Sequence, residues 1–215
     1  KRKVGYLKIM TLFEHEKAKY NIVHKSCDDG TTGNGRQLNE LLTSSSDFHN
    51  LWKSLANSSN SFLEIGLGCG TILDFFKENN IQYCGIDISD YIVESLSKRG
   101  LNVKHMSCHD MSFEDNSFDI VQHLDGLEHI PVEWENHALS EEVRVSKRYV
   151  FHANAMGDAW LDRVSKSKGF DEVHVNIKDE TGWDKFYNSN KERYGYNIIS
   201  KLISHNTYFT VLEKK

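Results

Sequence analysis

From about residue 61 onward, short apolar runs alternate with amphipathic stretches, which predicts alternating strands and helices. The predicted strands cover residues 62–65, 81–86, 103–106, 118–124 and 148–152. Amphipathic helices are expected between them, over residues 72–80, 91–98 and 133–147. Strands and helices that alternate with short connections are typical of an α/β fold with a doubly wound, mostly parallel sheet.

The two ends of the chain differ from this middle part. Residues 196–203 and 207–213 are consecutive strand-like runs with a tight link, which predicts an antiparallel C-terminal hairpin at the sheet edge. The whole then forms a seven-stranded, Rossmann-like sheet. Phe48, Leu51, Trp52 and Leu55 recur at helical spacing. We therefore expect an N-terminal helical cap over residues 1–59 and a main domain over 60–215.

Composition narrows the class of protein. The chain has 215 residues, of which 39% are hydrophobic and 27% charged, so it is long and apolar enough to fold around its own core. Its net charge of −5 disfavours a non-specific nucleic-acid binder. No apolar run approaches the roughly eighteen residues of a membrane span. The four cysteines are scattered without a C-x-x-C pair, which predicts thiols in a reducing cytoplasm.

A glycine loop follows the first strand of the main domain, where residues 62–70 read FLEIGLGCG. Its glycines, at positions where backbone can approach a ligand closely, are Gly66, Gly68 and Gly70. A dinucleotide fingerprint, G-x-G-x-x-G, would place the third glycine where Thr71 stands. Glu64 precedes the loop and would repel a pyrophosphate. The loop therefore favours a cationic or zwitterionic ligand over NAD.

Two acidic residues follow later strands in the same order. Asp87 closes the second strand, 21 residues beyond Gly66, and its carboxylate can accept both hydroxyls of a ribose. Asp110 follows the third strand and is placed to receive an adenine amino group. Either residue alone would be weak evidence, because acidic residues at strand ends commonly face solvent or cap a helix. In order and at these spacings, they indicate a nucleoside site.

From about Ser61 to its C-terminus the chain resembles class I S-adenosylmethionine-dependent methyltransferases. Residues 64–70 resemble the first motif of that family, 86–89 the second, 108–111 the third and 116–121 the entry to its fourth strand. The resemblance implies that Glu64 and the glycines face the methionine end of the cofactor, Asp87 the ribose and Asp110 the adenine. The cofactor-binding residues that it implies are Glu64, Gly66, Gly68, Gly70, Asp87, Ile88, His109, Asp110, Met111 and Leu124.

The fourth strand ends in a turn with candidate chemistry for the methyl acceptor. Asp125, Glu128 and His129 stand at i, i+3 and i+4, which on a helical turn brings their side chains to one face. Such a face can hold a divalent cation, and oxygen-rich ligands favour Mg²⁺ or Mn²⁺. In the metal-free alternative, His129 or His152 is the general base that takes the acceptor proton.

Residues 151–161 are similar to the corresponding segment of ubiquinone-pathway O-methyltransferases. In that group, and in small-RNA 3′-terminal ribose methyltransferases, an E-x-x-E-H motif with a later Asn or His holds Mg²⁺ or Mn²⁺. If this metal-binding pattern is carried over to the present sequence, the ligands would be Asp125, Glu128, His129 and either His152 or Asn154. Asp125 departs from this pattern because those families have Glu there, so both the metal and the metal-free interpretations stay open.

The segment before the hairpin carries the aromatic residues Trp183, Phe186, Tyr187 and Tyr194. They either line a pocket for a small organic acceptor or pack into the core from an amphipathic helix over residues 179–193. We expect an S-adenosylmethionine-dependent enzyme that O-methylates a small molecule or a saccharide hydroxyl. The alternatives are an RNA ribose 2′-O-methyltransferase, which the acidic pI of about 6.1 weakens, and a non-catalytic cofactor-binding protein.

Overall fold

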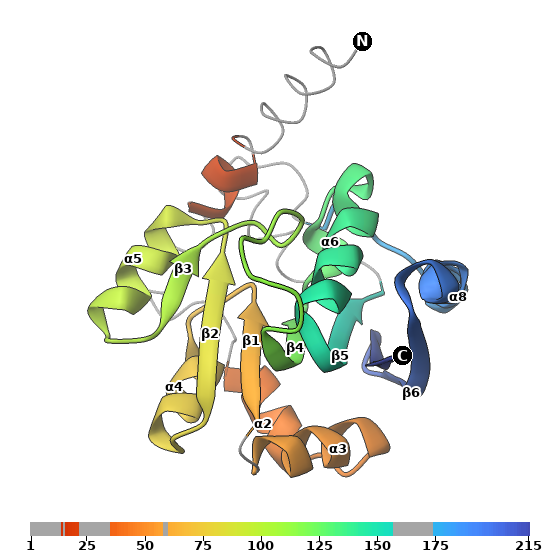
Figure 1. Cartoon of the computed structure of the whole chain (residues 1–215), viewed down its shortest axis with the longest axis horizontal. Helices are drawn as coiled ribbons and strands as arrows, with labels where there is room; N and C mark the ends of the chain where they lie inside the picture. Colours follow the sequence, from red (N-terminus) through yellow and green to blue (C-terminus); the bar gives the residue numbers. More distant parts are fainter. Residues whose placement is uncertain (1–13, 15, 22–34, 58–59, 157–173) are drawn as a thin grey trace.

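The computed structural model describes residues 14, 16–21, 35–57, 60–156 and 174–215. A seven-stranded sheet runs through the molecule in the order β3-β2-β1-β4-β5-β7-β6 (Figure 1). The strands are β1 (Ser61–Ile65), β2 (Gln82–Asp87), β3 (Val103–His105), β4 (Phe118–Leu124), β5 (Ser146–Ala155), β6 (Tyr196–Ser204) and β7 (Thr207–Lys214). β1 to β5 are parallel, and β7 is antiparallel to both β5 and β6. The predicted fold class is confirmed.

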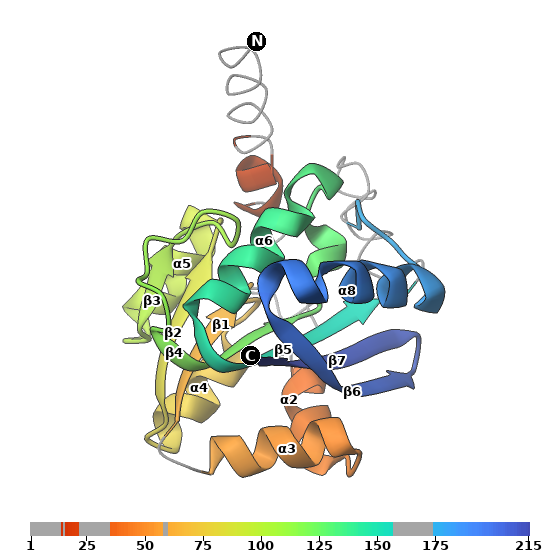
Figure 2. The same cartoon turned by 45° about the vertical axis from the view of Figure 1, so that its right-hand side comes forward.

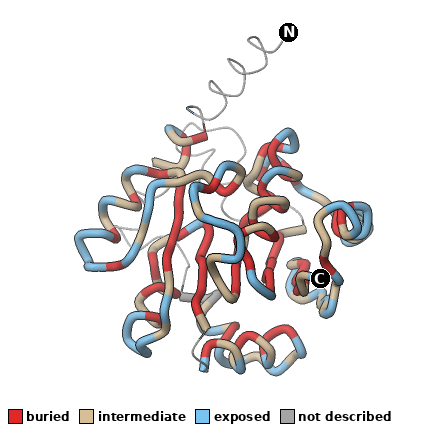
Figure 3. Tube along the Cα trace, in the orientation of Figure 1, coloured by how far each residue is buried: buried red, intermediate tan, exposed pale blue. Residues whose placement is uncertain are grey.

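Helices cover both faces of this sheet. They are α2 (Gly35–Thr43), α3 (Asp47–Ala56), α4 (Thr71–Glu78), α5 (Asp90–Lys98), α6 (Val132–Val145) and α8 (Glu180–Tyr194), with the 3₁₀ turn η2 at Leu127–His129. One apolar core joins the sheet to α2, α3, α4 and α5, and a second joins it to α6 and α8. All five residues of β1 are buried, as expected for a parallel strand covered on both faces (Figure 3).

The C-terminal hairpin forms as predicted. Its two-residue loop consists of His205 and Asn206, whose φ angles are +47° and +63°. Two successive left-handed residues form the turn that matches the twist of a hairpin. β6 and β7 extend the sheet beyond β5, beneath α8 in the view of Figure 2.

Two predicted boundaries and one open question are settled by the packing. The helix predicted over 133–147 ends at Val145, because β5 begins directly at Ser146 and runs to Ala155, well beyond the predicted 148–152. Trp183, Phe186 and Tyr187 are buried in the core beneath α8, and Tyr194 packs against that core. These rings therefore serve packing rather than lining an open acceptor pocket.

Candidate functional site

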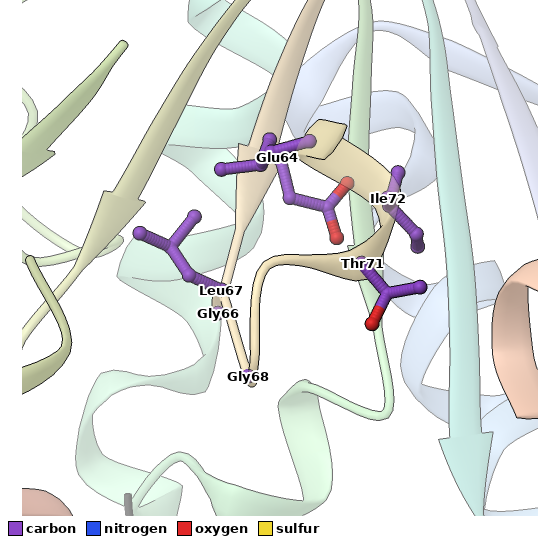
Figure 4. A pocket seen from close by; sticks show the side chains of 7 residues that line it. Glu64, Gly66, Leu67, Gly68, Thr71 and Ile72 are labelled. Atoms are coloured by element: carbon purple, nitrogen blue, oxygen red, sulfur yellow. The ribbon is translucent and has the colours of Figure 1, made fainter. Parts of the chain in front are cut away.

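The glycine loop joins β1 to α4 in a strained, left-handed backbone. Gly66, Gly68 and Gly70 have φ angles of +75°, +47° and +77°. A Cβ on Gly70 would stand 2.7 Å from a methyl group of Leu96, so both conformation and space require glycine there. A pocket opens at this loop, lined by Glu64, Gly66, Leu67, Gly68, Thr71, Ile72 and Leu73 (Figure 4).

Glu64 is a buried carboxyl in the wall of this pocket. In Figure 4 its carboxylate is directed into the turn between β1 and the start of α4. The Gln122 side-chain amide donates to it, and the Trp52 indole N–H of α3 donates to the Gln122 oxygen at 2.7 Å. Because the indole can only donate, it orients the amide so that its NH₂ group faces Glu64. Burial raises the pKa of Glu64 to about 8, and the hydrogen bond from Gln122 offsets only part of this effect.

Asp87 ties the glycine loop to the end of β2. Its two carboxylate oxygens accept the backbone N–H groups of Leu67, at 2.9 Å, and of Ser89, at 2.8 Å. Ile88 follows Asp87 and is half-buried. The structure thus brings the first two sequence motifs together around one loop.

The third motif lies at the neighbouring strand end. His109 stacks on Trp134, with ring centroids 4.2 Å apart, and burial lowers its pKa. Met111 is buried, and its N–H donates to Glu141 at 2.8 Å. Asp110 between them is exposed. Leu124 at the end of β4 is buried in the core beneath α3, α4 and α5.

The turn at residues 125–129, which we call the acceptor turn, differs from the helical turn that the sequence predicts. Asp125 has a left-handed φ of +50°, and only Leu127–His129 are helical, as a single 3₁₀ turn. The i, i+3, i+4 face is therefore not formed. Among the described residues, the donor atoms of Glu128, His129 and His174 lie within 4.8 Å of one another, whereas Asp125 and Asn154 are outside this group. His174 had no sequence signal, because it lies 45 residues beyond His129.

Glu128 is the most constrained member of this group. Its side chain is fully buried, and one carboxylate oxygen accepts the Ala155 N–H at 2.8 Å. The other oxygen has no hydrogen-bond partner among the residues that the structure describes. Burial raises the pKa of Glu128 well above its usual range, and the charge of Asp125 adds to this shift.

His152 and Asn154 lie in a different, fully buried network. His152 Nε2 is 2.8 Å from Glu142, and its Nδ1 is 2.8 Å from the Tyr187 hydroxyl, to which Asn154 also donates. Glu142 also bonds His123 Nδ1 at 2.7 Å. Both ring nitrogens of His152 are thus occupied. Sequence reasoning missed His123 and Glu142. His123 is a polar residue inside the apolar strand β4, which is a weak signal, whereas Glu142 looks like any other glutamate of helix α6.

A segment near the N-terminus lies against both halves of the site. Residues 16–21 are helical and lie above the carboxyl ends of β1 and β2 (Figures 1 and 2). The Asn21 side chain accepts the Ser89 hydroxyl at 2.8 Å, just beyond Asp87. The Tyr20 ring meets the His129 ring edge-on, with centroids 6.0 Å apart. The segment therefore connects the second motif with the acceptor turn.

Two further expectations concern the cysteines and the membrane. Cys84 and Cys108 are free and buried, but Cys69 is disulfide-bonded, which corrects the expectation of thiols only. Scattered cysteine spacing carries no pairing information, so this bond could not be predicted from the sequence. No helix in the described ranges is long and apolar enough to cross a membrane.

Comparison with known proteins agrees with this geometry. Residues 63–150 match the model of the methyltransferase domain family. No curated protein matches the sequence. Similar solved structures include a Pyrococcus horikoshii protein (19% identity, 86% of this chain, 93% of that chain, TM-score 0.62) and a Methanosarcina mazei S-adenosylmethionine-dependent methyltransferase (18%, 76%, 96%, TM-score 0.58). Another is the magnesium protoporphyrin IX methyltransferase of Synechocystis with bound S-adenosylhomocysteine (15%, 94%, 84%, TM-score 0.55).

The matched domain spans the glycine loop, Asp87, the acceptor turn and most of the parallel sheet, and the solved structures share the fold. The chain carries a methyltransferase domain over residues 63–150, and it shares its fold with solved S-adenosylmethionine-dependent methyltransferases. The domain match supports a methyltransferase enzyme that binds S-adenosylmethionine.

Proposed function

We propose that this methyltransferase acts on a hydroxyl oxygen of a small molecule or saccharide, and that Glu128, His129 and His174 hold a divalent cation beside the acceptor. The observation that carries the proposal is the convergence of their three donor atoms within 4.8 Å of one another. Two of these residues were expected from the sequence, and His174 takes the place expected for Asp125 and Asn154.

The donor set and its burial fit a cation. One carboxylate oxygen of Glu128 is enclosed and has no hydrogen-bond partner in the part of the chain that the structure describes, and such a group is costly unless a partner satisfies it. One carboxylate and two imidazoles suit Mn²⁺ or another first-row transition ion better than Mg²⁺, which prefers oxygen ligands. Of the two metals that the sequence predicts, Mg²⁺ and Mn²⁺, this donor set therefore favours Mn²⁺.

The residues of this chain then divide the work of methyl transfer. Glu64, Asp87 and the glycine loop hold the cofactor, and the half-buried His129 faces the acceptor side of the turn. A bound cation would supply a lowered pKa for the attacking hydroxyl. The acceptor oxygen forms a bond to the methyl carbon while the carbon–sulfur bond breaks, the sulfur keeps the electron pair, and the hydroxyl proton passes to solvent water. Such a transfer depends chiefly on an in-line approach, so positioning carries much of the rate.

Metal binding and methyl transfer can be tested on the same protein. After chelation, Mn²⁺ is titrated calorimetrically into the full chain saturated with S-adenosylhomocysteine, for the wild type and for Glu128→Gln. We expect binding by the wild type and its loss in Glu128→Gln, with His137→Ala, an exposed histidine of α6, as the matched control that still binds.

Catechols, vicinal diols and saccharides are then offered with S-adenosylmethionine, with and without Mn²⁺, and S-adenosylhomocysteine formation is followed. Mn²⁺-dependent turnover of a hydroxyl acceptor supports the proposal. Turnover without Mn²⁺ that is lost in His129→Ala supports the metal-free route with His129 as base. Turnover only with an added RNA oligonucleotide would contradict the small-molecule assignment.

A further inference from the structure

A cluster of ionisable side chains lies in the core on the α6 side of the sheet, apart from the acceptor turn. We call His123, Glu142 and His152 the His–Glu–His cluster; they come from β4, α6 and β5 and are 3%, 0% and 0% exposed. Their donor atoms lie within 4.8 Å of one another. Each histidine, however, is at hydrogen-bond distance of a different Glu142 oxygen, which is the geometry of a hydrogen-bonded cluster.

The neighbours of Glu142 in this cluster determine whether its carboxyl group is ionised. Asn154 donates to the Tyr187 oxygen, and the same hydroxyl lies 2.8 Å from His152 Nδ1. An ionised Glu142 can only accept, so His152 Nε2 and His123 Nδ1 donate to its two oxygens. Burial alone would raise the pKa of Glu142, but His152 and His123 outweigh it and lower that pKa to about 2. Glu142 itself is therefore ionised and carries a buried negative charge.

One end of the cluster reaches the glycine loop. His123 pairs in register with Ile65, the residue before Gly66, and with His152 on the other side. A Cβ built on Gly66 would lie 3.9 Å from His123 Cδ2 and Nε2, and one on Gly126 would overlap the same ring edge at 1.9 Å. The opposite end stops at Tyr187 and Asn154, which are fully buried. The charge thus lies behind the cofactor loop, and it also acts on the buried Cys108 and Tyr187, whose pKa values it raises.

The other ionisable side chains around the glycine loop do not have the same effect as Glu142. Arg99 donates to the Cys69 carbonyl and is paired with Asp74. Asp87 is held by two backbone amides, and the raised pKa of Glu64 keeps it protonated at neutral pH. A buried ion cluster gives little net stability and can often be replaced by apolar residues of similar size. Net stability alone therefore does not account for this cluster.

We propose that Glu142, through His123, favours the cationic cofactor over its neutral product and so sets the preference for S-adenosylmethionine over S-adenosylhomocysteine. The two ligands differ by the methyl group and the sulfonium charge, and a fixed negative charge behind the loop acts on that difference. Glu142 is a positioning residue in this sense, since it need not touch the ligand. The inference rests on the cofactor assignment and is independent of the methyl acceptor.

The test compares two affinities of the same variant. Calorimetric Kd values for S-adenosylmethionine and S-adenosylhomocysteine are measured for the wild-type chain and for Glu142→Gln. Removal of one buried charge should weaken S-adenosylmethionine binding about tenfold and leave S-adenosylhomocysteine within about twofold. Tyr187→Phe is the matched control, because it breaks the far end of the network while the Glu142 charge remains, and its affinity ratio should equal that of the wild type.

A purely structural role would give a different result. Equal losses for both ligands in Glu142→Gln, or the same shift of the ratio in Tyr187→Phe, would overturn the inference. If Glu142→Gln does not fold, the triple replacement of His123, Glu142 and His152 by leucine removes the charge with similar volume and should show the same tenfold shift; an unchanged ratio there would also overturn it. Failure of the wild type to bind either ligand would instead overturn the cofactor assignment.

Discussion

Glu64 gives the structure its most quantitative prediction, because its protonation differs between the folded and the unfolded chain. Its pKa is about 8 in the folded protein, against 4.5 for an ordinary glutamate. Between these two values the folded state binds one more proton than the unfolded state, so stability falls as pH rises. The slope is about −1.4 kcal/mol per pH unit. Above the folded pKa this loss is complete.

The perturbation is Glu64→Gln, which keeps the shape and removes the titration. From about pH 5.5 to about pH 7.5, the wild type should lose roughly 2–3 kcal/mol of unfolding free energy relative to this variant. The unfolding free energies of the variant and the wild type can differ at low pH, because the NH₂ group that the substitution introduces needs an acceptor. The prediction therefore concerns how unfolding free energy changes with pH, not its value at one pH. Urea unfolding at several pH values measures it.

The control is Glu114→Gln, which removes an exposed carboxyl and should follow the wild-type slope. Parallel pH profiles for the wild type and Glu64→Gln would refute the reasoning, because they would mean that Glu64 titrates alike in both states. A steeper loss in the variant than in the wild type would refute it as well.

Three further substitutions probe the rest of the site. Asp87→Ala should weaken S-adenosylmethionine binding by roughly 1.5–3 kcal/mol for each charge-assisted bond lost, and unchanged affinity by calorimetry would remove Asp87 from the ribose site. His129→Ala should lower turnover about a hundredfold or more while cofactor affinity is retained, whether His129 is ligand or base; near-normal turnover would exclude both roles. Gly126→Ala should destabilise the fold by roughly 1–3 kcal/mol, because its Cβ would overlap the His123 ring, and an unaltered urea midpoint would show that the ring moves freely.

The fold could be predicted from the sequence because its signals are local. Apolar runs in β1 and β4, and the glycines at the β1–α4 loop, each act within a few residues. Boundaries were less certain where one element follows another directly, as at Val145 and Ser146, since no breaker residue marks the change from helix to strand. The hairpin was easier, because a short polar link separates two similar runs.

The spacing of residues along the sequence predicts the cofactor loop well but the acceptor turn poorly. Glu64 and Asp87 stand at strand ends, and the sheet itself brings strand ends together. The group at Glu128 depends instead on a left-handed Asp125 and on His174 from a distant segment. The cluster around Glu142 depends on the register between His123 and His152 across β4 and β5. Backbone handedness and strand register are tertiary properties that a single sequence does not display.

Glu64 and Glu142 are both buried near the glycine loop, and their hydrogen-bond partners determine whether each is ionised. Glu64 has one neutral amide donor and is protonated at neutral pH, whereas Glu142 has two imidazole donors and is ionised. The ammonium group of the cofactor is shared by S-adenosylmethionine and S-adenosylhomocysteine, and only the sulfonium distinguishes them. Glu64→Gln should therefore change the affinities for both ligands by a similar factor, whereas Glu142→Gln should weaken the binding of S-adenosylmethionine alone. If Glu64→Gln also changed the ratio of the two affinities, the division of charge between these glutamates would be wrong.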